Sequence, residues 1–156
     1  MSYEGNGEVS AVFRPPDAVE SLQIRSTNAR LVAPGSLTGG RFGLFRWDMA
    51  TEADGASPHF HRTFSESFFI LSGTVRLYAG ERWVDGTAGD FLYVPEGGVH
   101  GFRNDADQPA SMLILFAPGA PRERYFEELA EISASGRQLT DDEWTEIYAR
   151  NDQYMV

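Results

Sequence analysis

The spacing of short alternating segments and turn residues is the feature that most restricts how this chain can fold. From residue 41 to residue 116, apolar and polar residues alternate over short runs, as expected of strands whose side chains point alternately to opposite faces. Turn dipeptides such as Ser72-Gly73 and Asp85-Gly86 separate the runs and favour tight hairpins. The predicted strands cover residues 41–49, 59–61, 66–71, 74–78, 82–84, 90–94, 99–103 and 111–116. This pattern predicts an all-β fold, built as an antiparallel barrel or sandwich.

Two of the predicted strands are apolar on both faces. Residues 68–71 read Phe-Phe-Ile-Leu and residues 112–116 read Met-Leu-Ile-Leu-Phe, so each needs cover both inside and outside the barrel. A preceding segment adds the apolar residues Leu22, Ile24, Leu31 and Val32. We therefore expect a homodimer joined through barrel exteriors, with the N-terminal strand added to the partner's sheet. The alternative is a monomer in which C-terminal helices provide the cover.

The sequence becomes helical in character after Pro118. Apolar residues recur there at helical spacing, at Tyr125, Phe126, Leu129 and Ile132 and again at Trp144, Ile147 and Tyr148. Pro121 suits a first helical turn, Gly136 a helix end, and Thr140 with Glu143 has the spacing of a capping box. We expect the aromatic residues of this segment to pack against the barrel exterior, in preference to lining a functional site.

All three histidines of the chain belong to two short patterns that together predict a metal site. His59 and His61 can present two imidazoles on one face of a strand, and Glu66 and His100 would complete the ligand set. Imidazole nitrogens with one carboxylate suit one divalent ion per chain, such as Fe, Ni, Mn, Cu or Zn, with positions left open for a ligand. Glu66 is either a direct ligand or a hydrogen-bonding partner that orients an imidazole. The alternative is a site that holds an organic ligand without metal.

The spacing of these residues resembles the cupin superfamily, whose signatures run in outline G-x5-H-x-H-x3or4-E-x6-G and G-x5-P-x-G-x2-H-x3-N. The second signature is complete, with Gly89, Pro95, Gly97, His100 and Asn104. In the first signature, His59, His61, Glu66 and Gly73 are correctly spaced, but only three residues separate Gly55 from His59. The signature has five there, a departure that touches a turn glycine and leaves the ligands unchanged. The resemblance implies one cupin domain over residues 1–156, with a jelly-roll barrel (a double-stranded β-helix) over about 22–118 and a helical segment over about 119–151.

Composition excludes several classes of chemistry and partner. A net charge of −10 disfavours nucleic acid and anionic membranes, since both are bound through clustered cations. No stretch is long and apolar enough to span a bilayer, and the first residues lack the basic start and apolar stretch of a secretory signal, so we expect a cytoplasmic protein. The chain contains neither cysteine nor lysine, which excludes disulfides, thiolate nucleophiles and Schiff bases.

The segment APGAPRERYFEELAE, residues 117–131, is similar to that of small single-domain cupins related to quercetin 2,3-dioxygenases. This resemblance implies a metal-dependent dioxygenase, an oxidoreductase whose partners are dioxygen and a flavonol-like or otherwise enolisable aromatic small molecule. Glu66 would then act as a ligand and as a catalytic proton acceptor. Two alternatives stay open: a non-redox cyclase or isomerase of an aromatic natural product, and a non-catalytic module that binds a small molecule.

Strand parity also suggests which side chains form the substrate pocket. Phe68 and Ile70 share the face of Glu66, and Phe102 shares the face of His100. These three residues are therefore candidates for an apolar, partly aromatic substrate pocket. The equally weighted alternative is that they only fill the interior of a small barrel.

Overall fold

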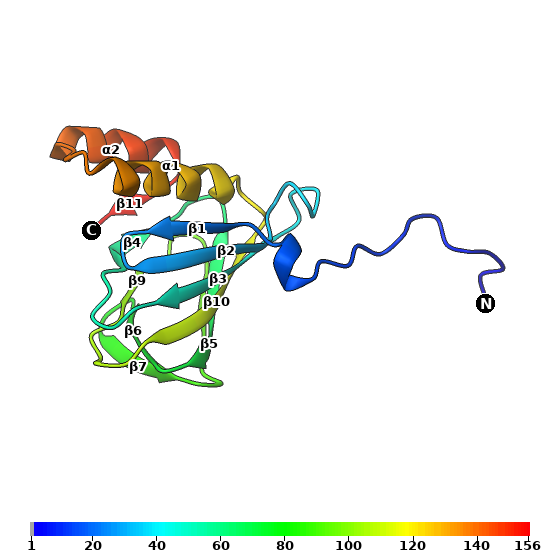
Figure 1. Ribbon diagram of the computed structural model, residues 1–156, viewed down its shortest axis with the longest axis horizontal. Helices are drawn as coiled ribbons and strands as arrows, with labels where there is room; N and C mark the ends of the chain where they lie inside the picture. The colour runs from blue at the N-terminus through cyan, green and yellow to red at the C-terminus, as the bar shows by residue number, and fades with distance from the viewer. Residues whose placement is uncertain (1) are drawn as a thin grey trace.

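Two facing antiparallel sheets and two C-terminal helices make up the fold of residues 2–156, which a computed structural model describes (Figure 1). The first sheet has the strand order β1 (Ser21–Ile24), β2 (Thr27–Ala33), β3 (Gly43–Met49), β10 (Ala110–Ala117), β5 (Ser65–Ser72) and β8 (Phe91–Val94). The second sheet has the order β11 (Tyr154–Met155), β4 (Ala56–Phe60), β9 (His100–Arg103), β6 (Thr74–Ala79) and β7 (Trp83–Thr87). A short 3-10 helix, η1 (Pro16–Ala18), precedes β1. The predicted all-β class is thus confirmed, and the hairpin β1–β2 and the short β11 extend the predicted set of strands.

The core lies between the two sheets, where alternate residues of the long strands point inward. Burial alternates along β3 and along most of β10, as expected for strands with one face against a core. Ile114 of β10 lies opposite Phe45 of β3 on one side and Phe68 of β5 on the other. All three are at most 1% exposed, and burial of each such side chain stabilises the fold by about 1.5–3 kcal/mol.

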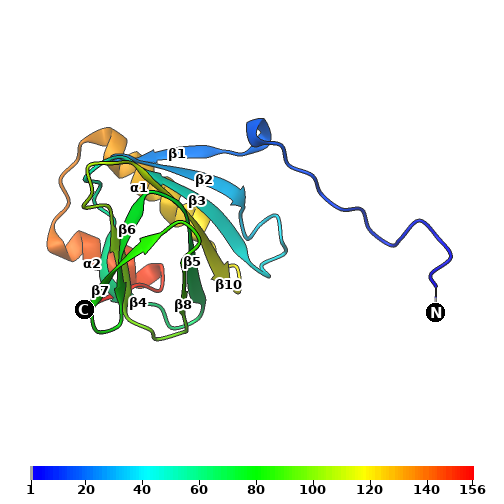
Figure 2. The same ribbon diagram turned by 90° about the horizontal axis from the view of Figure 1, so that it is seen from below.

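The two helices lie together at one side of the sandwich, above β1 and β11 in Figure 1 and largely behind the strands in Figure 2. Helix α1 (Arg122–Ser135) follows Pro121 and ends at Gly136, whose positive φ of 67° suits glycine. Helix α2 (Asp141–Arg150) begins with the predicted capping box, in which the Thr140 hydroxyl accepts from the Glu143 amide and the Glu143 carboxylate accepts from the Thr140 amide. In the described part of the chain, neither helix nor any other is long and apolar enough to cross a membrane.

The outer face of the first sheet carries exposed apolar side chains. They are Phe69 of β5, Phe91 and Tyr93 of β8, and Leu115 of β10. Neither helix covers them, since α1 lies against β1 at the far edge of this sheet. Residues 2–13 form an extended arm that leads away from the sandwich (Figure 1) and carries the exposed Val12 and Phe13. The arm ends at Arg14, whose guanidinium donates to the carbonyl oxygens of Leu31 and Val32.

Candidate metal centre

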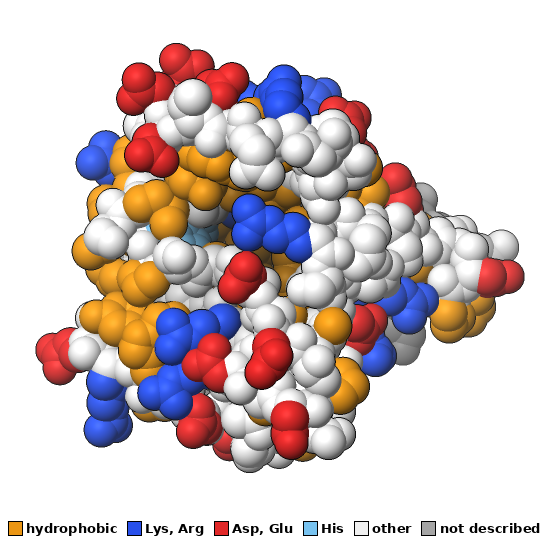
Figure 3. All heavy atoms as spheres, turned by 60° about the vertical axis from the view of Figure 1, so that its left-hand side comes forward, with side chains coloured by type: hydrophobic (Ala, Val, Ile, Leu, Met, Phe, Trp, Pro, Cys, Tyr) orange, Lys and Arg blue, Asp and Glu red, His pale blue; other side chains and the backbone are white. Residues whose placement is uncertain are grey.

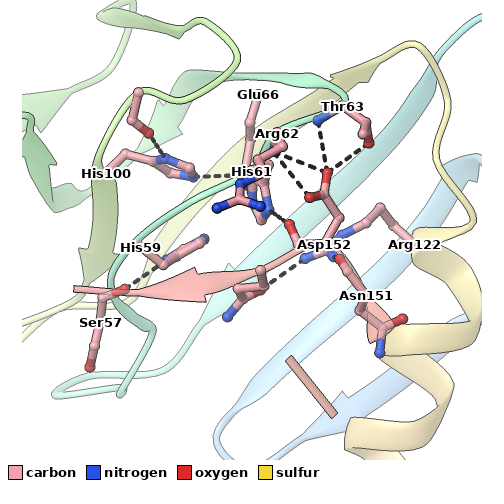
Figure 4. A network of polar contacts seen from close by, with 12 residues as sticks. Ser57, His59, His61, Arg62, Thr63, Glu66, His100, Arg122, Asn151 and Asp152 are labelled. Atoms are coloured by element: carbon pink, nitrogen blue, oxygen red, sulfur yellow. Dashed lines mark hydrogen bonds and ion pairs between the residues drawn. The ribbon is translucent and has the colours of Figure 1, made fainter. Parts of the chain in front are cut away.

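Both sheets contribute side chains to a buried cluster of three imidazoles and one carboxylate (Figure 4). His59 in β4 lies opposite His100, the first residue of β9, and His61 follows directly after β4. Glu66 comes from β5 in the other sheet. Each of the four is at most 4% exposed, and their potential ligand atoms all lie within 4.8 Å of one another. The structure therefore brings together all four residues of the predicted ligand set.

A backbone carbonyl oxygen anchors each imidazole at its Nδ1 atom. The three pairs are His59 with Ser57 at 2.7 Å, His61 with Asp152 at 2.7 Å, and His100 with Gly98 at 2.9 Å. Because a carbonyl oxygen only accepts, each Nδ1 carries the proton and donates it. Each Nε2 is then left with its lone pair in the neutral ring, the arrangement in which histidine binds a metal ion.

Glu66 supplies the charge of the cluster. Its Oε2 atom lies 3.0 Å from Nε2 of His61 and 2.7 Å from Nε2 of His100. A carboxylate oxygen repels a lone pair at such a distance, so either a proton or a cation must lie between them. This donor set fits a divalent metal ion, which would be held by the Nε2 atoms of the three histidines and by the Glu66 carboxylate.

The pKa values of the cluster follow from burial and from these close contacts. Burial raises the pKa of Glu66, but the charge of His100 and hydrogen bonds from both imidazoles outweigh it and hold that pKa well below its usual range. Burial lowers the pKa of His100, and the adjacent Glu66 more than compensates, so the net shift is upward. For His59, burial dominates and lowers the pKa to about 4. His59 is thus neutral at neutral pH, as metal binding requires.

The C-terminal tail fixes the position of His61. Besides its carbonyl contact with His61, Asp152 accepts hydrogen bonds at its carboxylate from the amides of Arg62 and Thr63 and from the Thr63 hydroxyl (Figure 4). The next residues form β11, in which Tyr154 pairs with Phe60 of β4. Sequence reasoning missed Asp152. Its φ is 53°, in a region that Asp and Asn adopt more readily than other non-glycine residues, and no sequence motif marks the position.

Two further residues of the second signature, Gly97 and Asn104, hold neighbouring backbone segments in place. The Gly97 amide donates to the carbonyl oxygen of His61 at 2.6 Å, and the φ of Gly97 is 79°, a value that favours glycine. Asn104 is buried, and its side-chain amide donates to the carbonyl oxygens of Ala50 and Gln108. Gly97 and Asn104 therefore support the ligands without joining them.

Gly55, the glycine at unusual spacing in the first signature, is required by a close approach of two backbones. A Cβ atom built on it would lie 1.9 Å from the carbonyl oxygen of Phe102, far inside van der Waals contact. Glycine is the residue that permits this packing next to β4. The altered spacing before His59 thus leaves a tightly packed loop and an intact ligand set.

A cavity of about 390 Å³ opens from the cluster toward the helices. His59, Glu66 and Phe102 line its inner part, and in the space-filling view histidine atoms are visible inside a hollow with hydrophobic side chains around it (Figure 3). Phe102 thus lines the cavity, and its role in a substrate pocket stays a prediction. Phe68 and Ile70 do not line this cavity and are at most 1% exposed. They fill the core, where the Phe68 ring centroid lies 5.8 Å from that of His100.

The helices contribute the outer wall of the cavity. Their apolar and aromatic lining residues are Tyr125, Phe126, Leu129, Ile132, Trp144 and Tyr148. These side chains pack against the core, as expected, and they also line the cavity, which we did not expect. Helical periodicity identifies the apolar face of a helix but not the part of the barrel against which that face packs.

Comparison with known proteins agrees with the fold and the ligand set. Residues 45–116 match the model of the Cupin domain family. Two facing antiparallel sheets with a buried His and Glu cluster are the architecture of a cupin. The chain belongs to the cupin superfamily.

Two curated relatives match parts of the chain. The quercetin 2,3-dioxygenase of Bacillus subtilis (strain 168) is 29% identical over 90 residues, which are 58% of this chain and 26% of that enzyme. An uncharacterized protein of Aquifex aeolicus (strain VF5) is 31% identical over 61 residues, 39% of this chain and 50% of that protein. The matches thus span between a quarter and a half of the relatives' lengths.

Solved structures share the fold at low sequence identity. The polyketide cyclase RemF from Streptomyces resistomycificus has a TM-score of 0.60 and 20% identity, over 69% of this chain and 80% of that one. KdgF from Halomonas sp. has a TM-score of 0.61 and 14% identity, over 70% of this chain and 94% of that one. Ectoine synthase from P. lautus has a TM-score of 0.63 and 13% identity, over 77% of this chain and 87% of that one. At these identities the likeness shows the fold alone.

Proposed function

We propose that this cupin is a metal-dependent dioxygenase of the quercetinase-like type, which acts on a flavonol-like or otherwise enolisable aromatic compound. The observation that carries the proposal is the position of Glu66. Its carboxylate contacts two imidazoles of the cluster and also lines the cavity. One group can therefore contact the metal and a bound substrate.

Glu66 has a free oxygen for proton transfer. Both of its hydrogen bonds fall on Oε2, and among residues 2–156 none is donated to Oε1. A carboxylate oxygen without a hydrogen bond is a proton acceptor. It can accept the hydroxyl proton of an enolisable substrate and return it to the product. A divalent metal held by His59, His61 and His100 would supply Lewis acidity for the resulting enolate.

The shape and lining of the cavity support an aromatic substrate. Its volume of about 390 Å³ falls within the range of small-molecule sites, about 300–1,000 Å³. Trp47, Phe102 and Phe126 belong to its wall, so flat rings can be enclosed on several sides. The partial similarity to a quercetin 2,3-dioxygenase supports the same substrate class.

Oxygen uptake tests the proposal. Protein purified without chelators is analysed for metal, and the loaded protein is then screened in an oxygen electrode with quercetin and related enolisable aromatic compounds. A dioxygenase adds both atoms of dioxygen to the substrate, so the substrate is the reductant and one dioxygen is consumed per product. Product formation that continues without oxygen would instead indicate a cyclase or isomerase. Binding without turnover in either atmosphere would indicate a non-catalytic module.

A further inference from the structure

Arg122, the first residue of α1, places a buried positive charge in the wall of the cavity. The side chain lines the same cavity as His59 and Glu66, and the residue is 4% exposed. Figure 4 shows Arg122 on α1 beside Asn151 and Asp152 of the tail. Two other arginines of the cavity wall, Arg25 and Arg137, are exposed to solvent. Arg122 is therefore the buried cation of this cavity.

The guanidinium of Arg122 is only partly satisfied. One Nη atom donates to the carbonyl oxygen of Asn151 at 2.9 Å and the other to the side-chain oxygen of Gln153 at 3.2 Å. Its Nε–H is buried and has no partner, and each Nη atom carries one further N–H beyond those two hydrogen bonds. Within residues 2–156 no carboxylate lies within ion-pair distance of it. A buried charge of this kind is usually paired.

Aromatic rings hold the guanidinium in place without neutralising it. Its central carbon lies between 4.4 and 5.5 Å from four ring centroids, those of Tyr125, Phe116, Phe64 and Phe126. Cation–π contacts are favourable, but a ring face offers no oxygen acceptor for the remaining N–H groups. A planar guanidinium with free donors matches the two oxygens of a carboxylate.

We propose that Arg122 forms an anion subsite that binds a carboxylate group on the aromatic ligand of this cavity. The inference rests on the proposed function, which gives an aromatic substrate. It adds that this substrate carries a carboxylate group. A carboxylate is favoured over a phosphate because a single buried cation balances a single negative charge.

Binding of two matched probes to metal-free protein tests the subsite without reference to turnover. Benzoate and benzamide have similar shapes and differ in charge, and metal-free protein excludes direct binding of benzoate to a metal. In calorimetric titrations we expect wild-type protein to prefer benzoate by at least about tenfold. Arg122→Met should remove this preference and leave benzamide affinity within about twofold. The control Arg25→Gln, which removes an exposed cation of the same cavity, should retain the preference.

Two results would overturn the subsite: no preference for benzoate in the wild-type protein, or an unchanged preference in folded Arg122→Met. Near-ultraviolet circular dichroism reports whether that variant folds. Should it not fold, the guanidinium ¹⁵N resonances of Arg122 in wild-type protein decide the question. They shift on benzoate addition if the subsite exists and stay unchanged if it does not. Oxygen uptake is measured separately, so failure of the dioxygenase proposal would leave this result standing.

Discussion

His61 Nδ1 lies 2.7 Å from the backbone carbonyl oxygen of Asp152, a residue 91 positions further along the chain. The C-terminal tail thereby orients a candidate metal ligand that belongs to the first half of the sequence. Such partners fix the tautomer and direction of a metal-binding imidazole. The metal centre and the docking of the tail should therefore be coupled.

Removal of the Asp152 side chain should weaken metal binding although Asp152 is not a ligand. Asp152→Ala loses the hydrogen bonds from Arg62 and Thr63 that position the tail, and we expect metal affinity to fall by about tenfold or more. Competition with a coloured chelator measures it. Asp152→Asn keeps oxygen acceptance and tolerates the positive φ, so its affinity should fall less. Equal affinity in wild type and Asp152→Ala would contradict the coupling.

His100→Ala should abolish stoichiometric metal binding. Three imidazoles leave no spare nitrogen ligand, and loss of a ligand should cost more than the roughly tenfold to hundredfold effect of a supporting group. Elemental analysis of protein purified without chelators measures the content. Glu96→Gln, a change at an exposed residue close by in the sequence, serves as the control. Retention of one metal ion per chain in His100→Ala would show that His100 is not a ligand.

Glu66→Gln should impair turnover far more than folding. The amide preserves the shape of the side chain but is a weak base and a poorer metal ligand, and loss of a general base typically costs about 10²–10⁴ in rate. Initial rates on a confirmed substrate, together with thermal unfolding, separate the two effects. Unchanged turnover would leave Glu66 without a catalytic role and favour a site of three histidines.

Local rules of sequence predict most of the strands, both helices and the four residues of the candidate metal cluster. Parity along a strand placed His59 and His61 together, and the spacing of Thr140 and Glu143 predicted the start of α2, because both rules depend on neighbouring residues. Parity gives the face of a strand but not the depth along the barrel, so it does not distinguish a pocket position for Phe68 from the core position that the structure shows.

Long-range contacts explain what the sequence did not reveal. Asp152 reaches His61 through a backbone atom, which has no side-chain signature. No sequence feature sets Arg122 apart from the other arginines of the chain, and the packing of α1 buries it in the cavity wall. The contact of Asp152 with His61 and the burial of Arg122 both depend on how the C-terminal segment packs against the barrel. Local periodicity does not predict this packing.

Alkaline pH should destabilise the protein through Tyr125. Burial raises the pKa of Tyr125 to about 12, from about 10 in an unfolded chain. The folded state thus retains a proton that the unfolded state loses. The contribution to stability is complete below about pH 10 and is lost as pH rises through 12, by about 2–3 kcal/mol in all. The chain has neither lysine nor cysteine, so tyrosines dominate titration in this range.

Urea unfolding at pH 9, 10 and 11 measures this effect. Tyr125→Phe should lose less free energy of unfolding than wild-type protein over that range. Tyr148, whose pKa burial also raises, is half-buried, so Tyr148→Phe is the matched control with a smaller expected effect. A wild-type pH profile identical to that of Tyr125→Phe would refute the assignment.

The exposed apolar face of the first sheet predicts a homodimer. Its members are Phe69, Phe91, Tyr93 and Leu115, with Phe91 64% and Phe69 42% exposed. Contiguous apolar surface of this kind is uncommon on monomers, and β8 is an edge strand of the sheet with unpaired backbone groups. The extended arm of residues 2–13, with exposed Val12 and Phe13, can pair with the sheet of a second copy. We therefore expect two chains joined through these faces.

Light scattering coupled to size exclusion at micromolar concentration tests this dimer. The expected mass is twice that of the 17.3 kDa chain. Variants locate the interface. Phe91→Glu places a charge within the proposed interface and should yield monomers, because an unpaired charge is costly to bury. Glu81→Arg, in the turn between β6 and β7 of the other sheet, should leave the dimer intact. Deletion of residues 2–13 should weaken the dimer if the arm crosses between subunits. A single-chain mass that does not change on concentration would refute the dimer.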